Sequence, residues 1–155
     1  IAVSDSGWSA DLGGLTIEAQ FHGFGQTAGD LFVYVPEAKV MWTGNPLIAE
    51  APAIPWLLDG RGGEVSTTLA EIRDSLPQSA VVVPGHGRPV SVDGFNFSLG
   101  YLGALIEGVE SSVAAGHDVD ETVQAVTLPD YQGYALWGWI HSAVNVPNTY
   151  TELSQ

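Results

Sequence analysis

Three glycine-containing loops carry the polar side chains whose types and order suggest a functional site. Gln26 lies in Gly25-Gln26-Thr27-Ala28-Gly29-Asp30, Asn45 in Thr43-Gly44-Asn45-Pro46, and His86 in Pro84-Gly85-His86-Gly87. Each loop follows a short apolar run, and α/β folds commonly build their sites where strands end. Amide oxygens and an imidazole nitrogen can bind a cation or a substrate. A histidine between two glycines is equally typical of a turn, so His86 by itself leaves a ligand and a turn residue open.

The other polar candidates favour structural roles. His141 lies on an apolar stretch with Trp137 and Trp139, so it is either a hydrogen-bonded core imidazole, which we favour, or a catalytic group. Asp30 is expected to orient its own loop. His22 is expected to be structural, and His117 to lie in a solvated loop.

The elements that position these loops can be read from the apolar periodicity. Strands are predicted at Leu15–His22, Leu31–Val35, Lys39–Thr43 and Ala80–Val83, the second and third forming a hairpin around Pro36-Glu37-Ala38. Helices are predicted from Ser66, as the cap, to Leu76, over Phe97–Ala115, from an Asp118 or Asp120 cap to Val126, and over Tyr134–Val144 with a break at Pro147. The order β-β-β-α-β-α-α-α predicts an α/β fold with helices on at least one sheet face.

Composition limits the partners and the metal ligands. The 155 residues include 18 acidic and 4 basic side chains, giving a net charge of −14, and their number fits a single domain over residues 1–155. No cationic cluster exists for nucleic acid or an anionic membrane. Without cysteine, a metal must be bound by His, carboxylate, amide or water. No apolar segment predicts a membrane span, so we expect a soluble, cytoplasmic chain, and the start at Ile1 suggests a processing site or a fragment boundary.

Taken together, the three loops resemble the C-terminal half of the metallo-β-lactamase fold superfamily, a family of metal-dependent hydrolases. There, one strand ends in His-Thr-x-Gly-Asp, a hairpin leads to Thr-Gly-Asp, and a later strand ends in Pro-Gly-His-Gly. The matching residues here are Gln26-Thr27-Ala28-Gly29-Asp30, Thr43-Gly44-Asn45 and Pro84-Gly85-His86-Gly87. The resemblance covers roughly residues 15 to 153 and implies the C-terminal half of an αββα sandwich, a mixed sheet with helices on its outer face.

The resemblance also implies a metal site at Gln26, Asn45 and His86, but two ligand types have changed. The family places His, a bridging Asp and His at these positions. Asn45 is neutral, and a bridging carboxylate offsets the charge of two cations and keeps their shared hydroxide nucleophilic. Gln26 and Asn45 are therefore either weak ligands and substrate hydrogen-bonders, or structural amides that bond neighbouring backbone. The family's N-terminal His-x-His-x-Asp-His motif does not occur in this sequence.

A lone C-terminal half would expose the inner face of its sheet, which implies a partner. The candidates are an N-terminal half of the same fold, on another chain or in a cleaved precursor, or a second copy of this chain.

Two functions follow. The first is a hydrolase of a small-molecule ester, thioester, lactone or amide, in which a companion half completes a weakened or mononuclear site, with Asn45 and His141 as the catalytic candidates. Zinc is then the expected metal, with iron or manganese as alternatives. The second is a degenerate, metal-free member of the fold that serves binding, assembly or metal-free chemistry, and that is a pseudoenzyme if it only binds or assembles.

Overall fold

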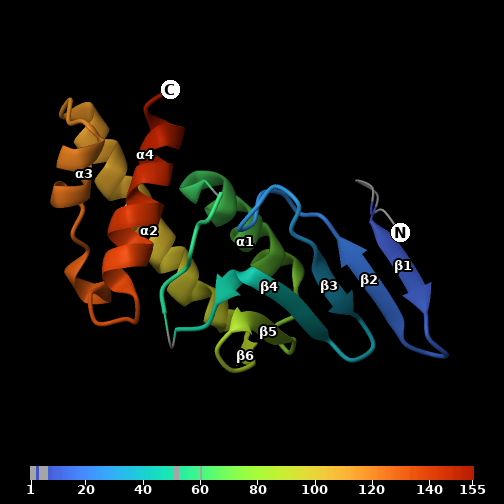
Figure 1. Ribbon diagram of the computed structural model, residues 1–155. Helices are drawn as coiled ribbons and strands as arrows, with labels where there is room; N and C mark the ends of the chain where they lie inside the picture. Colours follow the sequence, from blue (N-terminus) through green and yellow to red (C-terminus); the bar gives the residue numbers. More distant parts are fainter. Residues whose placement is uncertain (1–2, 4–6, 51–52, 60) are drawn as a thin grey trace.

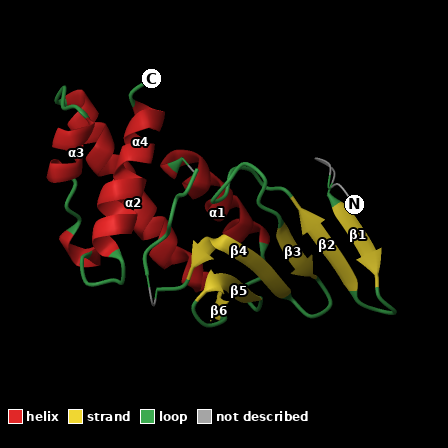
Figure 2. Ribbon diagram, viewed as in Figure 1, coloured by secondary structure: helices red, strands yellow, loops and turns green. Residues whose placement is uncertain are grey.

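The computed structural model describes residues 3, 7–50, 53–59 and 61–155, and Ile1 lies outside this range. In the described part of the chain, the strands form one six-stranded mixed sheet in the order β1-β2-β3-β4-β5-β6. They are β1 (Trp8–Asp11), β2 (Thr16–Gln20), β3 (Phe32–Val35), β4 (Val40–Ile48), β5 (Val81–His86) and β6 (Val90–Ser91). The helices, shown in Figure 2, are α1 (Gly62–Ser75), α2 (Phe95–Ala114), α3 (Val119–Ala125), the π-helix η3 (Gly138–Asn145) and α4 (Val146–Leu153). None of these described helices is long and apolar enough to cross a bilayer.

The pairing of the strands explains why the three loops meet. Strands β1 to β4 are antiparallel neighbours, whereas β4 and β5 are parallel and are connected through α1. The carboxyl ends of β4 and β5 therefore lie at the same end of the sheet. The predicted hairpin of β3 and β4 is confirmed, and β1 and β6 add a strand at each edge.

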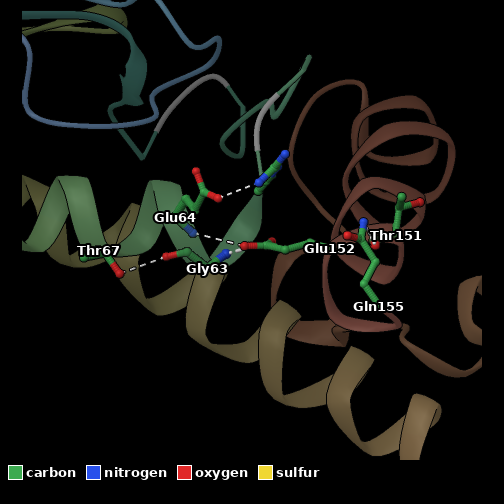
Figure 3. Close-up of polar contacts among 7 residues, drawn as sticks. Gly63, Glu64, Thr67, Thr151, Glu152 and Gln155 are labelled. Atoms are coloured by element: carbon green, nitrogen blue, oxygen red, sulfur yellow. Dashed lines mark hydrogen bonds and ion pairs between the residues drawn. The ribbon is translucent and has the colours of Figure 1, made fainter.

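Three predicted helix boundaries are wrong. The stretch predicted from Tyr134 becomes helical only near Gly138, where η3 begins. Helix α1 begins at Gly62, four residues before the expected cap Ser66, because the cap comes from elsewhere in the chain. Figure 3 shows the Glu152 carboxylate of α4 at the α1 N-terminus, where it accepts from Gly63 N at 3.1 Å and from Glu64 N at 3.3 Å. Pro147 does not break the last helix, since it lies in the first turn of α4, where its missing N–H has no intrahelical partner to lose.

The helices cover one face of the sheet. Phe32, Met41 and Val82 point to this face and are at most 3% exposed, in one core with Leu69 and Ile72 of α1 and with α2. Strands β1 and β2 extend beyond the helical layer (Figure 1).

The opposite side of the sheet, which we call the open face, is apolar from β1 to β5, and Ser91 adds a polar side chain at the β6 edge. Strand register places ten apolar side chains on it: Trp8, Ala10, Ile17, Ala19, Val33, Val35, Val40, Trp42, Val81 and Val83. Trp42 is 43% exposed and Val81 is 44% exposed, which is unusual for large apolar side chains of central strands. None of the ten belongs to the hydrophobic core cluster.

The β1–β2 hairpin has the opposite pattern to the one expected if its helical side were buried. Here the side chains on the helical side of the sheet are polar, while the open-face side chains are apolar. The polar ones are Ser9, Asp11, Thr16, Glu18 and Gln20. Alternation of this kind assigns the apolar side to the interior of a protein, so this hairpin is patterned to bury the open face.

Candidate site at the ends of strands β4 and β5

The first loop brings Gln26 to the centre of the candidate site. Asp30 orients this loop, as predicted, by accepting from Thr27 N at 2.6 Å and from Thr27 Oγ1 at 3.0 Å. Gln26 is only 5% exposed, and its Nε2 donates to the carbonyl oxygen of Trp56 at 3.1 Å. Because a carbonyl can only accept, this bond fixes which end of the Gln26 amide is nitrogen.

The second loop joins Asn45 to Gln26. Asn45 Nδ2 donates to Gln26 Oε1 at 3.2 Å, although the Asn45 side chain itself lies at the exposed end of the pair. The two amides therefore form a directed chain, from Asn45 through Gln26 to the Trp56 carbonyl. Both amides that the resemblance placed at metal-ligand positions are engaged with protein partners.

The third loop lies directly against the second. A side chain at Gly85 would place its Cβ only 2.6 Å from Asn45 N and 2.7 Å from Asn45 Cα, so the contact requires glycine. His86 accepts Ala49 N through its backbone oxygen at 3.1 Å, while its imidazole is exposed. The structure thus brings Gln26, Asn45 and the His86 loop together, as the strand ends predicted.

His141 is not part of this group of loops. It is 1% exposed on η3, its ring is stacked on Trp137 with centroids 4.0 Å apart, and both ring nitrogens have partners. Nε2 is 2.6 Å from the Val126 carbonyl oxygen and Nδ1 is 2.9 Å from the Tyr101 hydroxyl. The carbonyl requires a proton on Nε2, so in the neutral ring Nδ1 accepts from Tyr101. This geometry agrees with the favoured structural role, and the catalytic role of His141 remains a prediction.

Burial determines the acid–base properties of this interior. It lowers the pKa of His141 below its ordinary value, the hydrogen bond to Val126 opposing the shift, and it raises the pKa of the Tyr101 hydroxyl. Asn145, 0% exposed, completes the network by donating to Tyr101 OH at 2.9 Å.

The residues present do not fit the dinuclear metal centre that the resemblance implies. Two neutral amides and one imidazole are a poor donor set for zinc, and here the Gln26 oxygen already accepts a hydrogen bond from Asn45. Within the described residues, no three His, Asp or Glu side chains are grouped so that they could hold a metal ion.

The hollows that the structure shows near α1 lie elsewhere. A cavity of about 480 Å³ next to Glu152 is lined by His22, Phe24, Glu64 and Glu71 among others. A second, of about 320 Å³, lies on the other side of Glu152 and includes Asp59 and Arg61. Neither includes Gln26, Asn45 or His86. Sequence reasoning missed Glu152, Trp56 and Asn145 as partners because each acts across 30 or more residues of chain.

Comparison with solved structures identifies the architecture. The chain is similar to a metallo-β-lactamase from Pontibacter korlensis, with 24% identity over 63% of this chain and 46% of that one and a TM-score of 0.57. It is also similar to TMB-1, with 18% identity over 66% and 47% of the two chains (TM-score 0.57), and to VMB-1, with 19% identity over 64% and 45% (TM-score 0.55).

The chain spans about half the length of these structures. No protein-family model and no curated protein sequence matches it. Identities below 25% carry the fold alone, and the architecture expected from the three loops is confirmed: this chain has the metallo-β-lactamase fold, as a mixed sheet with helices on one face.

Proposed function

We propose that this chain is one half of a metal-independent member of the metallo-β-lactamase fold, a binding module that works with a companion half. The observation that carries the proposal is the directed hydrogen-bond chain from Asn45 through Gln26 to Trp56. It uses the two positions at which the resemblance places metal ligands. The exposed ends of this group, Asn45 and the His86 imidazole, are the groups that would contact a small-molecule ligand.

Metal analysis of the intact protein tests this proposal. After purification with its companion half, and after zinc is added and free zinc is removed, we expect less than about a tenth of an equivalent of zinc, iron or manganese, because the amide donor set favours none of them. Stoichiometric metal would contradict the proposal. The double variant Gln26→His with Asn45→Asp restores the ligand types of the family, and we expect it to bind more zinc than wild type in calorimetry. Gln132→His with Asn96→Asp adds the same residue types away from the site and serves as the control.

A metal-dependent hydrolase is the second candidate. It is favoured by the convergence of the three loops and by the likeness to solved metallo-β-lactamases. In this alternative the companion half supplies most of the ligands and His86 supplies one. The metal analysis separates the two candidates, since only the hydrolase needs an equivalent of metal for activity on an ester, thioester, lactone or amide.

The companion half is proposed from the open face. Ten apolar side chains and the inverted polarity of the β1–β2 hairpin require a cover, and the similar solved structures contain roughly as much chain again as matches here. A second copy of the chain is disfavoured because each copy carries a net charge of −14.

Photo-crosslinking tests which protein covers the open face. A benzoyl-phenylalanine placed at Trp42 should crosslink, in the cells that produce the protein, to a segment with alternating apolar residues from a companion half. The same probe at Trp139, which is 47% exposed on η3, is the control and should not yield this segment. Sequenced crosslinks to a second copy of this chain, or to the same segments from both positions, would contradict the proposed partner.

A further inference from the structure

The segment of residues 55–59, here called the strap, lies between the candidate site and the C-terminal helices. Two bonds connect it to the first loop: Gln26 Nε2 donates to Trp56 O at 3.1 Å, and Asp59 N donates to Gln26 O at 3.2 Å. The position of the strap therefore determines where the Gln26 side chain finds its acceptor.

One buried side chain holds the strap on both sides of Trp56. Asn145 Oδ1 accepts from Leu57 N at 2.9 Å, and Asn145 Nδ2 donates to Pro55 O at 2.7 Å. Because the Leu57 amide can only donate and the Pro55 carbonyl can only accept, the Asn145 amide has a single orientation that satisfies both.

The second hydrogen of Asn145 Nδ2 extends the network into the core. It is donated to the Tyr101 hydroxyl at 2.9 Å, and Tyr101 in turn donates to His141 Nδ1 at 2.9 Å. Asn145 is 0% exposed, and Tyr101 and His141 are also buried. Both amide hydrogens and the amide oxygen of Asn145 have partners, so the amide is held in place from the strap and from the core together.

We propose that Asn145 is a positioning residue for the candidate site: by holding Pro55 and Leu57, it places the Trp56 carbonyl that orients the amides of Gln26 and Asn45. The inference rests on the proposed function in one respect, the assignment of that amide pair as the ligand-contacting group. In this arrangement the Asn45 nitrogen is directed at Gln26, and the Asn45 oxygen lies against Gly85.

The test follows the side-chain amide signals of Gln26 and Asn45 by NMR in the full chain. The variant Asn145→Asp has the same shape, and its carboxylate still accepts from Leu57 N but cannot donate to Pro55 O. When protonated, the introduced carboxyl can again donate. We therefore expect the Gln26 signals of N145D to move when this carboxyl ionises and to return towards wild type as pH falls, beyond any change in wild type over the same range.

Asn148→Asp is the matched control. Asn148 Nδ2 donates to Leu57 O at 2.9 Å and to Leu58 O at 2.8 Å, so it contacts the strap beyond Trp56 without enclosing it. N148D should move the Gln26 signals less than N145D does through the same titration, because its two contacts lie beyond Trp56. Unmoved Gln26 signals in N145D, or equal movement in both variants, would overturn the proposal.

If N145D does not fold, hydrogen exchange of the wild-type chain tests the positioning role of Asn145 instead. Protons held by one cooperative unit open together, so the Leu57 amide and the Gln26 side-chain amide should have protection factors that agree within about threefold. A difference above about tenfold would overturn the positioning role. Neither measurement uses metal or ligand, so a failure of the metal-independent function would leave the role of Asn145 standing, and the reverse also holds.

Discussion

At the scale of single residues, the Asn45–Gln26 pair needs a hydrogen-bond donor at Asn45, which an ionised carboxylate cannot supply. In Asn45→Asp, an acceptor would face Gln26 Oε1, and Gln26 cannot turn over because Trp56 O is also an acceptor. We expect N45D to lower the free energy of unfolding at pH 7 by about 1–2 kcal/mol, the cost of a buried acceptor without a donor. Urea unfolding followed by tryptophan fluorescence measures this loss.

The pH dependence of this penalty is a sharper test than its size. In N45D the protonated carboxyl can donate to Gln26 Oε1, so the difference between N45D and wild type should shrink as pH falls through the carboxyl pKa, near or above about 4. The exposed Asn96→Asp on α2 is the control, with no comparable recovery expected. A penalty that is constant with pH would show that Asn45 and Gln26 are not paired as described.

The residue types in the three loops were enough to predict that the loops lie close together, because each loop follows a strand and these strand ends lie at the same end of the sheet. They could not predict what Gln26 and Asn45 do there. Amides act as ligands or as structural hydrogen bonders according to their neighbours, and the deciding neighbour, the Trp56 carbonyl, is 30 residues from Gln26 in the sequence. For His141 the same applies, since only the fold reveals Tyr101 and Val126 at its two nitrogens.

At the scale of elements, α1 depends on a cap from the other end of the chain. Glu152→Gln removes the charge and one of the two accepting oxygens at the α1 N-terminus. We expect a loss of about 0.5–1.5 kcal/mol in thermal or urea unfolding, the usual size of a capping and helix-dipole effect. The same substitution at the exposed Glu110 of α2 should change stability by less than about 0.5 kcal/mol. Equal effects of the two substitutions would contradict the cap.

The π-helix η3 makes stability depend on pH through His141. Burial lowers the folded-state pKa of His141, so the unfolded chain binds a proton first as pH falls. Stability is therefore complete above the unfolded pKa of about 6.5 and decreases as pH drops below it, down to the folded pKa. The neutral ring also needs its Nδ1 as an acceptor for Tyr101, which protonation would remove.

The variant His141→Gln isolates this effect. Burial also lowers the pKa of His22, so wild type should lose stability from both histidines as pH falls below about 6.5. H141Q should have a flatter profile over this range, and His22→Gln should retain the His141 part. An unchanged slope in H141Q would mean that folding does not lower the pKa of His141.

Element boundaries were predictable where the signal is local and not where it is remote. Asp118 was one of two expected caps, and the structure confirms it, with a reciprocal bond to Glu121 within one turn. The prediction that Ser66 caps α1 was wrong because Glu152 of α4 supplies the cap. The prediction of a break at Pro147 was wrong because the preceding turns form a π-helix that runs directly into α4. Pro147 therefore lies in the first turn of α4.

At the scale of the whole molecule, the open face and the net charge act in opposite directions. The ten open-face side chains are uncharged and apolar and favour association, whereas −14 charges per chain oppose the approach of a second copy. The sequence predicted an exposed inner face through the resemblance; of the ten apolar side chains that the strand register places on the open face, Trp42 and Val81 are exposed, whereas Ala19 and Val35 are buried. Long-range repulsion is screened by salt, while burial of apolar surface is not.

The isolated chain should therefore associate when salt is added. At pH 7 we expect monomers at about 10 mM salt and dimers or larger species at about 1 M, where the Debye length falls to roughly 3 Å. Trp42→Ser should weaken the association constant at high salt by about tenfold or more, because it removes the most exposed aromatic side chain of the open face. Trp139→Ser removes an equally exposed tryptophan from η3 and should leave the constant unchanged. Sedimentation velocity measures both variants, and a larger effect of Trp139 would place the associating surface on the helices, which would contradict a partner on the open face.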